Sequence, residues 1–315
     1  MKTLKHQLLG SLVALSLLAL AQPLFAQGPP SLTSHYVPGV EGIKGASLPP
    51  PGFYLRDYNV FYLASQLNNA DGDEMNMDFD LMAYAQVFRP IYITKWKLLG
   101  ASYGMDVIVP FAYTDLELNI PGLGRASDSS FNLSDVFVEP ITLSWHGKRF
   151  DAAVGYGFYV PTGDYDAPDP TNPARTSPGK GFWTHMLTAG GTWFFDEPKT
   201  WAVSALCRYE INMENSDLDI TPGQEFTLEW GVSKTLAKTI DVGLVGYYQQ
   251  QVTEDNGHDG AAASDDLDHV ASVGPEVNAF IPKLKLFASL RYLYEFSASD
   301  RPQGSTVTLT LTKMF

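Results

Sequence analysis

Acidic side chains are the most frequent groups in this sequence that could carry chemistry. The 315 residues include 35 Asp and Glu against 21 Lys and Arg, a formal net charge of −14. Nucleic-acid binding requires a basic face, so we expect no nucleic-acid partner. Catalysis, metal binding and the lining of a polar passage are the roles open to the acids.

Asp268, His269 and Ser272 together carry the groups of a serine hydrolase. Ser272 lies three residues from His269, and such residues point to opposite faces of a strand, so the two cannot meet within one strand. Asp78 and Asp80 share a face and could hold a water molecule, but no Asp-His pair on a second strand accompanies them. We assign no catalytic residue, and an enzyme is the least favoured class of function.

Two acidic stretches, Asp71 to Glu74 and His258 to Asp268, could bind Ca²⁺ or Mg²⁺ through oxygen ligands. Neither has the spacing of an EF-hand loop, and the sequence contains no zinc cluster or phosphate-binding glycine loop. Cys207 is the single cysteine, so an internal disulfide cannot form. We therefore predict no metal site and no cofactor, and interpret the acidic stretches as solvated loops.

The last twelve residues, Gly304 to Phe315, indicate which elements position the acids. Val307, Leu309 and Leu311 fall on one face of an extended strand, and the threonines between them fall on the other, because strand side chains alternate with period 2. An apolar face opposite a hydroxyl face suits a wall between lipid and water. Ending on an aromatic residue is typical of the closing strand of bacterial outer-membrane β-barrels, through which the barrel-assembly machinery would bind.

Alternating segments of this kind recur along residues 52–315. Twelve are predicted, at about Phe53–Leu67, Met77–Thr94, Leu98–Tyr113, Asn132–Trp145, Phe150–Pro161, Phe182–Phe195, Trp201–Ile211, Glu225–Thr235, Ile240–Val252, His269–Ile281, Leu284–Phe296 and Ser305–Phe315. The fold class is therefore all-β: a transmembrane antiparallel up-and-down β-barrel of about twelve strands. In the second segment, we expect Phe79 and Leu81 to face lipid and Asp78 and Asp80 to face the lumen.

The connections between these segments alternate between long and short. The long ones are residues 68–76, 115–131, 162–181, 212–224, 253–268 and 297–304, and the short ones 95–97, 146–149, 196–200, 236–239 and 282–283. Short turns at one rim and long loops at the other are typical of outer-membrane barrels. A soluble β-sandwich or lipocalin-like barrel would also alternate, but has no reason to sort its loops in this way.

The N-terminal region precedes the first strand. Residues 1–26 have the positive start, apolar run and small-residue cleavage site of a secretory signal peptide. Residues 27–51 are rich in Gly and Pro and show no period. We expect them to form an arm that lies in the periplasm or folds into the lumen as a plug.

The fifth predicted strand ends in a turn whose residues have local structural roles. Pro161 ends the ladder, Gly163 permits an unusual backbone angle, and the aspartates can cap the turn. The stretch runs Pro161, Thr162, Gly163, Asp164, Tyr165, Asp166.

Several stretches, including this turn, resemble one protein family. The others are His35–Gly39, Leu48–Tyr54, Tyr209–Asn212 and Gly246–Asp255. They are similar to outer-membrane proteins assigned to the MetA pathway of phenol degradation, which include sphingosine-induced porin-like proteins. The resemblance implies a barrel that admits small hydrophobic or aromatic molecules across the outer membrane, so we expect a channel for their passive uptake. We expect outer-membrane lipid around the barrel and lipopolysaccharide at its acidic loops. A structural or adhesin-like barrel that transports nothing is the alternative.

Charged residues that strand parity places toward the lumen are the candidates for function. They are Asp57, Asp78, Asp80, Asp106, Asp135, Glu139, Arg208, Glu210, Glu225, Glu229, Glu276, Arg291 and Glu295. One interpretation is a network of ion pairs around the two arginines that fills a narrow lumen. The other is an acidic constriction that repels anions. Tyr247, Phe88, Phe137, Trp183 and Trp193 could add apolar surface to the lumen or pack against the arm.

The acidic-constriction interpretation predicts that the mature protein conducts cations in preference to anions. Rings of like charge repel ions of the same sign, and acids outnumber bases among the candidates. Planar-bilayer recordings under a salt gradient measure this preference directly. Clear anion selectivity would rule the interpretation out.

Overall fold

The computed structural model describes residues 34–122, 124–167, 171–257 and 266–315. The predicted signal peptide, the start of the arm and part of the acidic stretch before Asp268 lie outside these residues. The strands are β1 (Gly52–Leu67), β2 (Asp78–Leu98), β3 (Ala101–Ile120), β4 (Gly124–Leu133), β5 (Val136–His146), β6 (Phe150–Val160), β7 (Thr184–Phe194), β8 (Trp201–Asn212), β9 (Ile220–Thr221), β10 (Glu225–Leu236), β11 (Ile240–Gln251), β12 (Asn256–Gly257), β13 (His269–Ile281), β14 (Leu286–Ser299) and β15 (Pro302–Met314). A single 3₁₀ turn, Pro282–Leu284, is the helical element of the described residues.

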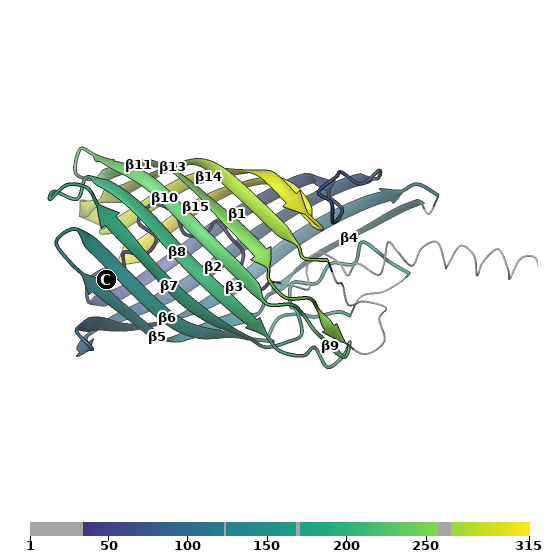
Figure 1. Cartoon of the computed structure of the whole chain (residues 1–315), viewed down its shortest axis with the longest axis horizontal. Helices are drawn as coiled ribbons and strands as arrows, with labels where there is room; N and C mark the ends of the chain where they lie inside the picture. The colour runs from purple at the N-terminus through teal and green to yellow at the C-terminus, as the bar shows by residue number, and fades with distance from the viewer. Residues whose placement is uncertain (1–33, 123, 168–170, 258–265) are drawn as a thin grey trace, which may run out of the picture.

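Twelve of the strands close into a barrel (Figure 1). The order is β2-β1-β15-β14-β13-β11-β10-β8-β7-β6-β5-β3, and pairing of β3 with β2 completes the ring. All neighbours are antiparallel, and β15 pairs with β1 from Met314 opposite Tyr54 to Pro302 opposite Leu67. Within this twelve-stranded ring of the described residues, each strand has a neighbour on both sides, and in the same sheet only β4, which pairs with β3 alone, is an edge strand. The predicted all-β up-and-down barrel is confirmed, and each of the twelve predicted segments corresponds to one strand.

The prediction of a loop at residues 115–131 was wrong. Instead, β3 continues to Ile120, and β4 pairs back along it from Gly124 opposite Ile120 to Leu133 opposite Phe111. Gly122 and Gly124 adopt φ of 86° and 101°, a region open to glycine, so the turn between the strands can be tight. This hairpin projects beyond the barrel at the right of Figure 1.

β15 has the predicted apolar outer face and hydroxyl-bearing inner face. Val307 and Leu309 are 41% and 39% exposed, while Thr306 and Thr308 are buried. The apolar side chains therefore line the outer surface, where lipid would contact them, and the hydroxyls line the interior.

The β2 strand has the opposite orientation from the one predicted. Arg56 of β1 pairs with Arg89, and Val60 pairs with Ala85. Directly paired residues share a face, and Val60 is buried in the interior, so the odd-numbered residues of β2 point inward. Asp78 and Asp80 consequently lie on the outer face. The expectation that apolar faces meet lipid fails here because this part of the interior is itself apolar.

The arm, defined here as residues 34–51, runs inside the barrel. Tyr36 packs with Phe137 and Tyr159 near the rim that carries the long loops. Leu48 packs on Tyr54 and Ile91 near the opposite rim, which carries the short turns.

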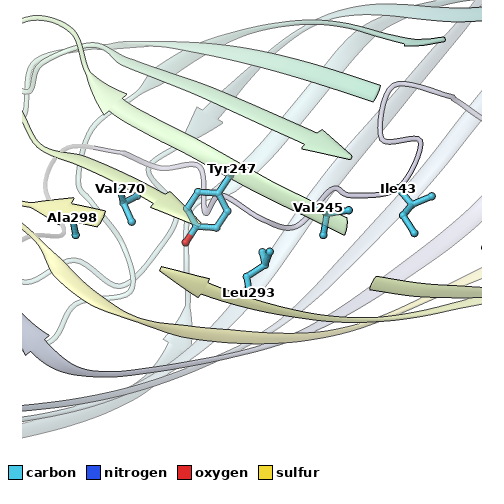
Figure 2. Close-up of a cluster of buried hydrophobic side chains, with 6 residues drawn as sticks. All are labelled: Ile43, Val245, Tyr247, Val270, Leu293 and Ala298. Carbon is cyan, nitrogen blue, oxygen red and sulfur yellow. The ribbon is translucent and has the colours of Figure 1, made fainter. Parts of the chain in front are cut away.

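Between these two ends, the arm contributes to an apolar cluster in the interior. Ile43 belongs to a cluster with Val245, Tyr247, Val270, Leu293 and Ala298 (Figure 2). The arm therefore extends through the lumen from one rim to the other.

The described residues contain no helix that is long and apolar enough to cross a membrane.

We expect Leu309→Arg to destabilise the barrel by about 2–4 kcal/mol, because it places a charge on the lipid-facing side of a strand. Leu309→Ala is the matched control, since it removes the same side chain without adding charge. Denaturant unfolding from lipid vesicles gives both free energies. Equal losses in the two variants would contradict a lipid-facing position.

Candidate functional site

Carboxylates of the barrel wall hold the backbone of the arm. Glu210 on β8 accepts hydrogen bonds from the backbone nitrogens of His35 at 3.0 Å and Tyr36 at 3.1 Å. Glu229 on β10 accepts from the nitrogens of Gly39 at 2.9 Å and Glu41 at 3.0 Å. The arm forms no strand or helix, so its buried N–H groups need acceptors from elsewhere. The wall carboxylates supply them.

Residues 43–47 of the arm also bind to carboxylates of the wall. Glu276 on β13 accepts from the backbone nitrogen of Ile43 at 2.8 Å. The Lys44 ammonium lies 2.9 Å from an Asp241 carboxylate oxygen, and Ser47 donates to Asp151 at 2.8 Å. Contacts thus continue to the short-turn rim.

At the long-loop rim, His35 is the anchor of the arm. Its Nε2 lies 2.9 Å from Asp135 Oδ2, and its Nδ1 lies 2.8 Å from Thr184 Oγ1. The ring stacks on Tyr159 with a centroid distance of 4.6 Å. Asp135 also accepts from the Gly163 nitrogen at 2.8 Å. The turn at residues 161–166 is therefore linked through Asp135 to the arm.

Two glycines allow the arm to pass close to the wall. Gly39 has φ of +83° and its carbonyl accepts a hydrogen bond from Arg291. A Cβ at Gly42 would lie 1.9 Å from a Glu276 carboxylate oxygen. No side chain fits at Gly42 without moving the ion pair between Glu276 and Arg291.

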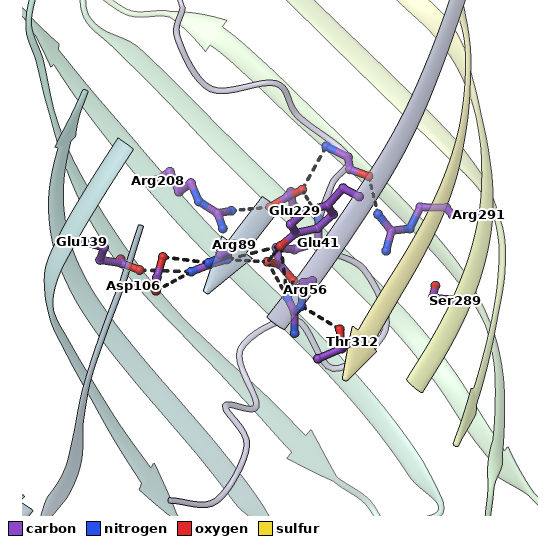
Figure 3. A network of polar contacts seen from close by, with 12 residues as sticks. Glu41, Arg56, Arg89, Asp106, Glu139, Arg208, Glu229, Ser289, Arg291 and Thr312 are labelled. Atoms are coloured by element: carbon purple, nitrogen blue, oxygen red, sulfur yellow. Dashed lines mark hydrogen bonds and ion pairs between the residues drawn. The ribbon is translucent and has the colours of Figure 1, made fainter. Parts of the chain in front are cut away.

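Glu41 occupies the centre of an ion-pair network in mid-barrel (Figure 3). One of its carboxylate oxygens, Oε1, accepts from Arg56 at 2.9 Å, Arg89 at 3.0 Å and the Tyr58 hydroxyl at 2.9 Å. Three donors of the wall thus share one carboxylate oxygen of the arm.

Wall carboxylates complete this network. Arg89 binds Asp106 through two nitrogens, at 2.8 and 3.0 Å, and Glu139 at 3.1 Å. Arg208 pairs with Glu229 and lies 4.1 Å from the centre of the Tyr36 ring. Most charges of the mid-barrel are thus paired, as expected for the ion-pair interpretation.

A cavity of about 210 Å³ lies beside the arm. Its wall on the β1 to β3 side is apolar, with Val60, Val87 and Ile108 among the lining residues. Glu41 and the arginines of the network lie along the same cavity. The space therefore combines an apolar surface with a charged end.

Most of the candidate residues are buried in the interior. These are Asp106, Asp135, Glu139, Arg208, Glu210, Glu225, Glu229, Glu276, Arg291 and Glu295. Asp57 lies on the opposite face of β1 from Arg56 and Tyr58, and Asp78 and Asp80 lie on the outer face of β2. On β1 the inward-facing residues are therefore the even-numbered ones, whereas the sequence prediction had placed the odd-numbered Asp57 in the lumen.

Sequence reasoning missed Arg56, Arg89 and Glu41. Arg56 alternates with Tyr54 and Tyr58 on one face of the first strand, and this pattern could have identified it as an inward-facing residue. Arg89 was hidden because it shares its face with a run of apolar residues. Nothing in the sequence of the arm marks Glu41 as the centre of a network.

The aromatic candidates divide between the two faces. Phe137 and Tyr247 are buried and pack near the arm, whereas Trp183 and Trp193 are 45% and 50% exposed on the outer face. Phe88 belongs to the outward-facing set of β2. The interior therefore receives two of the five aromatic rings.

Among the described residues, His269 and Ser272 do not hydrogen-bond to each other, and no metal cluster is present. His269 contacts the hydroxyls of Ser297 and Ser299, at 3.2 and 2.7 Å, while the buried Ser272 hydroxyl has no hydrogen-bond partner among them. No group of three His, Cys, Asp or Glu residues in the described ranges is placed to hold a metal ion.

Residues 64–311 match the family described as "Putative MetA-pathway of phenol degradation". The chain belongs to this family. The resemblance predicted from the sequence is confirmed, since the match covers most of the chain. A search of curated proteins found no match.

Solved structures resemble the barrel at low sequence identity. An outer membrane channel from Pseudomonas putida F1 is 14% identical, with a TM-score of 0.73 over 89% of this chain and 100% of that one. The translocator domain of the autotransporter NalP from Neisseria meningitidis is 11% identical, with a TM-score of 0.47 over 87% and 92% of the two chains. The first likeness shows the fold, which is that of the outer-membrane barrels of Gram-negative bacteria.

We expect Glu229→Ala to release the arm, because it removes the acceptor of two arm nitrogens and the partner of the buried Arg208. Breaking a buried ion pair costs on the order of 3–5 kcal/mol. A free-energy change of about 1.4 kcal/mol alters the ratio of released to docked arm tenfold. Trypsin should then cleave after Lys44 at least about tenfold faster, since cleavage follows the open population. Fragment masses over a time course measure the rate.

Glu225→Ala is the control for this experiment. Glu225 lies on the same face of the same strand and is fully buried, and its carboxylate accepts no hydrogen bond from the described residues. Equal acceleration in both variants would contradict a specific anchoring role for Glu229.

Proposed function

We propose that the protein is an outer-membrane channel for passive uptake of small hydrophobic or aromatic compounds, and that the arm closes it. The observation that carries the proposal is the arm itself, which fills the lumen but leaves an apolar cavity against one wall. A cavity with apolar walls favours solutes in proportion to the apolar area that they bury. The name of the family supports an aromatic solute.

The contacts of the arm suit a segment that moves. They are hydrogen bonds and ion pairs to wall side chains, and the arm has no ladder of backbone hydrogen bonds with any strand. Water could replace each of these contacts once the arm leaves, so the wall carboxylates would not remain unsatisfied. Water cannot replace the apolar and ring contacts of the arm, which include those of His35, Tyr36, Ile43 and Leu48.

A barrel whose arm never leaves would be a structural or adhesin-like protein. The filled lumen favours this second candidate, because a permanent plug leaves no path across the membrane. The two candidates differ in conductance and solute uptake, so one set of experiments separates them. Insertion through the C-terminal strand by the barrel-assembly machinery and contact of acidic loops with lipopolysaccharide stay predictions under either.

We expect removal of residues 28–47 to raise single-channel conductance severalfold over the full-length protein in planar bilayers. This deletion keeps Leu48, which packs at the short-turn rim, and removes the part that fills the lumen. Liposomes containing the full-length protein should also admit phenol faster than protein-free liposomes. Unchanged conductance would exclude a plug, and absent uptake together with absent conductance would favour the structural barrel.

A further inference from the structure

Three donors of the barrel wall converge on a single carboxylate oxygen in mid-barrel. Glu41 Oε1 accepts from Arg56 Nη1 at 2.9 Å, Arg89 Nη1 at 3.0 Å and the Tyr58 hydroxyl at 2.9 Å. Arg56 Nη1 also lies 3.0 Å from Oε2 (Figure 3). Donors arranged in this way form a carboxylate site, and Glu41, which belongs to the arm rather than to the wall, occupies it.

Arg89 has wall carboxylates as partners, but Arg56 has none among the described residues. Arg89 pairs with Asp106 and Glu139, both wall residues. In the described part of the chain, the only carboxylate that forms an ion pair with Arg56 is Glu41. The other partners of Arg56 are the hydroxyls of Thr312 at 3.1 Å and Tyr58 at 3.2 Å. Withdrawal of Glu41 would leave a largely buried guanidinium without a counter-ion, which is unfavourable.

The cavity beside this site has the size and surface for a small apolar body. It measures about 210 Å³, and Val60, Val87, Ile91 and Ile108 contribute apolar lining. A dry cavity of roughly 150 Å³ can hold benzene, so one aromatic ring fits. Arg56, Arg89 and Tyr58 lie along the same cavity, which places the charged site next to the apolar wall.

We propose that Arg56, Arg89 and Tyr58 bind the carboxylate of a small aromatic or apolar monocarboxylic acid, and that Glu41 occupies this site when the arm is docked. The ligand and Glu41 compete, so binding of the ligand weakens docking of the arm. This inference rests on the proposed entry of solutes into the lumen and narrows their class. A neutral solute gains nothing from the site, because it cannot supply the missing charge.

Benzoate and benzamide are the test ligands, because they have nearly the same shape and differ in charge. We expect Glu41→Gln to lower the dissociation constant of benzoate by about tenfold or more, since the competing group is removed. The constant for benzamide should change by less than about twofold. NMR titration of the full-length protein in detergent micelles at pH 7.5 measures both, and heat-modifiable gel mobility verifies folding. Adding Arg56→Gln to Glu41→Gln should abolish the preference for benzoate.

Lys44→Gln is the matched control, because it removes the contact of the arm with Asp241 without touching the carboxylate site. Its ratio of benzoate to benzamide affinity should equal that of the unmodified protein. An equal gain for both ligands in Glu41→Gln, or the same benzoate gain in Lys44→Gln, would overturn the site. Phenol uptake with no benzoate preference would overturn this inference and leave the channel standing. A benzoate preference without uptake or conductance would support the site and remove the channel.

Discussion

The interior of this barrel depends on one requirement, that buried backbone groups find hydrogen-bond partners. The described part of the arm forms neither a strand nor a helix, and only a few of its N–H groups, such as those of Gly45 and Ser47, are satisfied by turns within the arm. Glu210, Glu229 and Glu276 each accept from one or more of them. A carboxylate can accept several hydrogen bonds at once, which makes it an economical partner for irregular backbone. The many acids of the wall are explained by the arm as much as by any solute.

The same requirement explains which parts of the fold could be predicted from the sequence. Strand number and closure depend on period-2 alternation and on turns, both of which are local. β15 is the clearest case, because its outward residues are aliphatic and its inward residues are threonines. The β3–β4 hairpin was missed because the run Asp128, Ser129 and Ser130 has the composition of a loop. Its pairing partner is β3 itself, and the extension of β3 also pairs with β2, from Thr114 to Asn119.

Orientation on β2 and the central network could not be predicted, for a physical reason. A charge points inward in an empty barrel, so polarity alone assigns the faces. In a filled barrel, the interior must also pack, and Val87 and Ala85 face inward with Arg89 on one strand. Asp78 and Asp80 can then face outward near the end of the strand, where both are exposed. Glu41 lacks any pattern because the arm takes its conformation from the wall.

The position of Glu41 in the arm bears on how a solute could displace it. A ligand shifts an equilibrium only by its difference in affinity for the two states, and a monocarboxylate replaces one side chain among many arm contacts. Expulsion of the whole arm therefore requires more free energy than one ion pair supplies. Local release requires less, because Gly39 and Gly42 flank Glu41, and the positive φ of Gly39 shows a backbone conformation that glycine adopts freely. A solute that takes over Arg56 could thus detach the middle of the arm while His35 and Leu48 remain bound at the two rims.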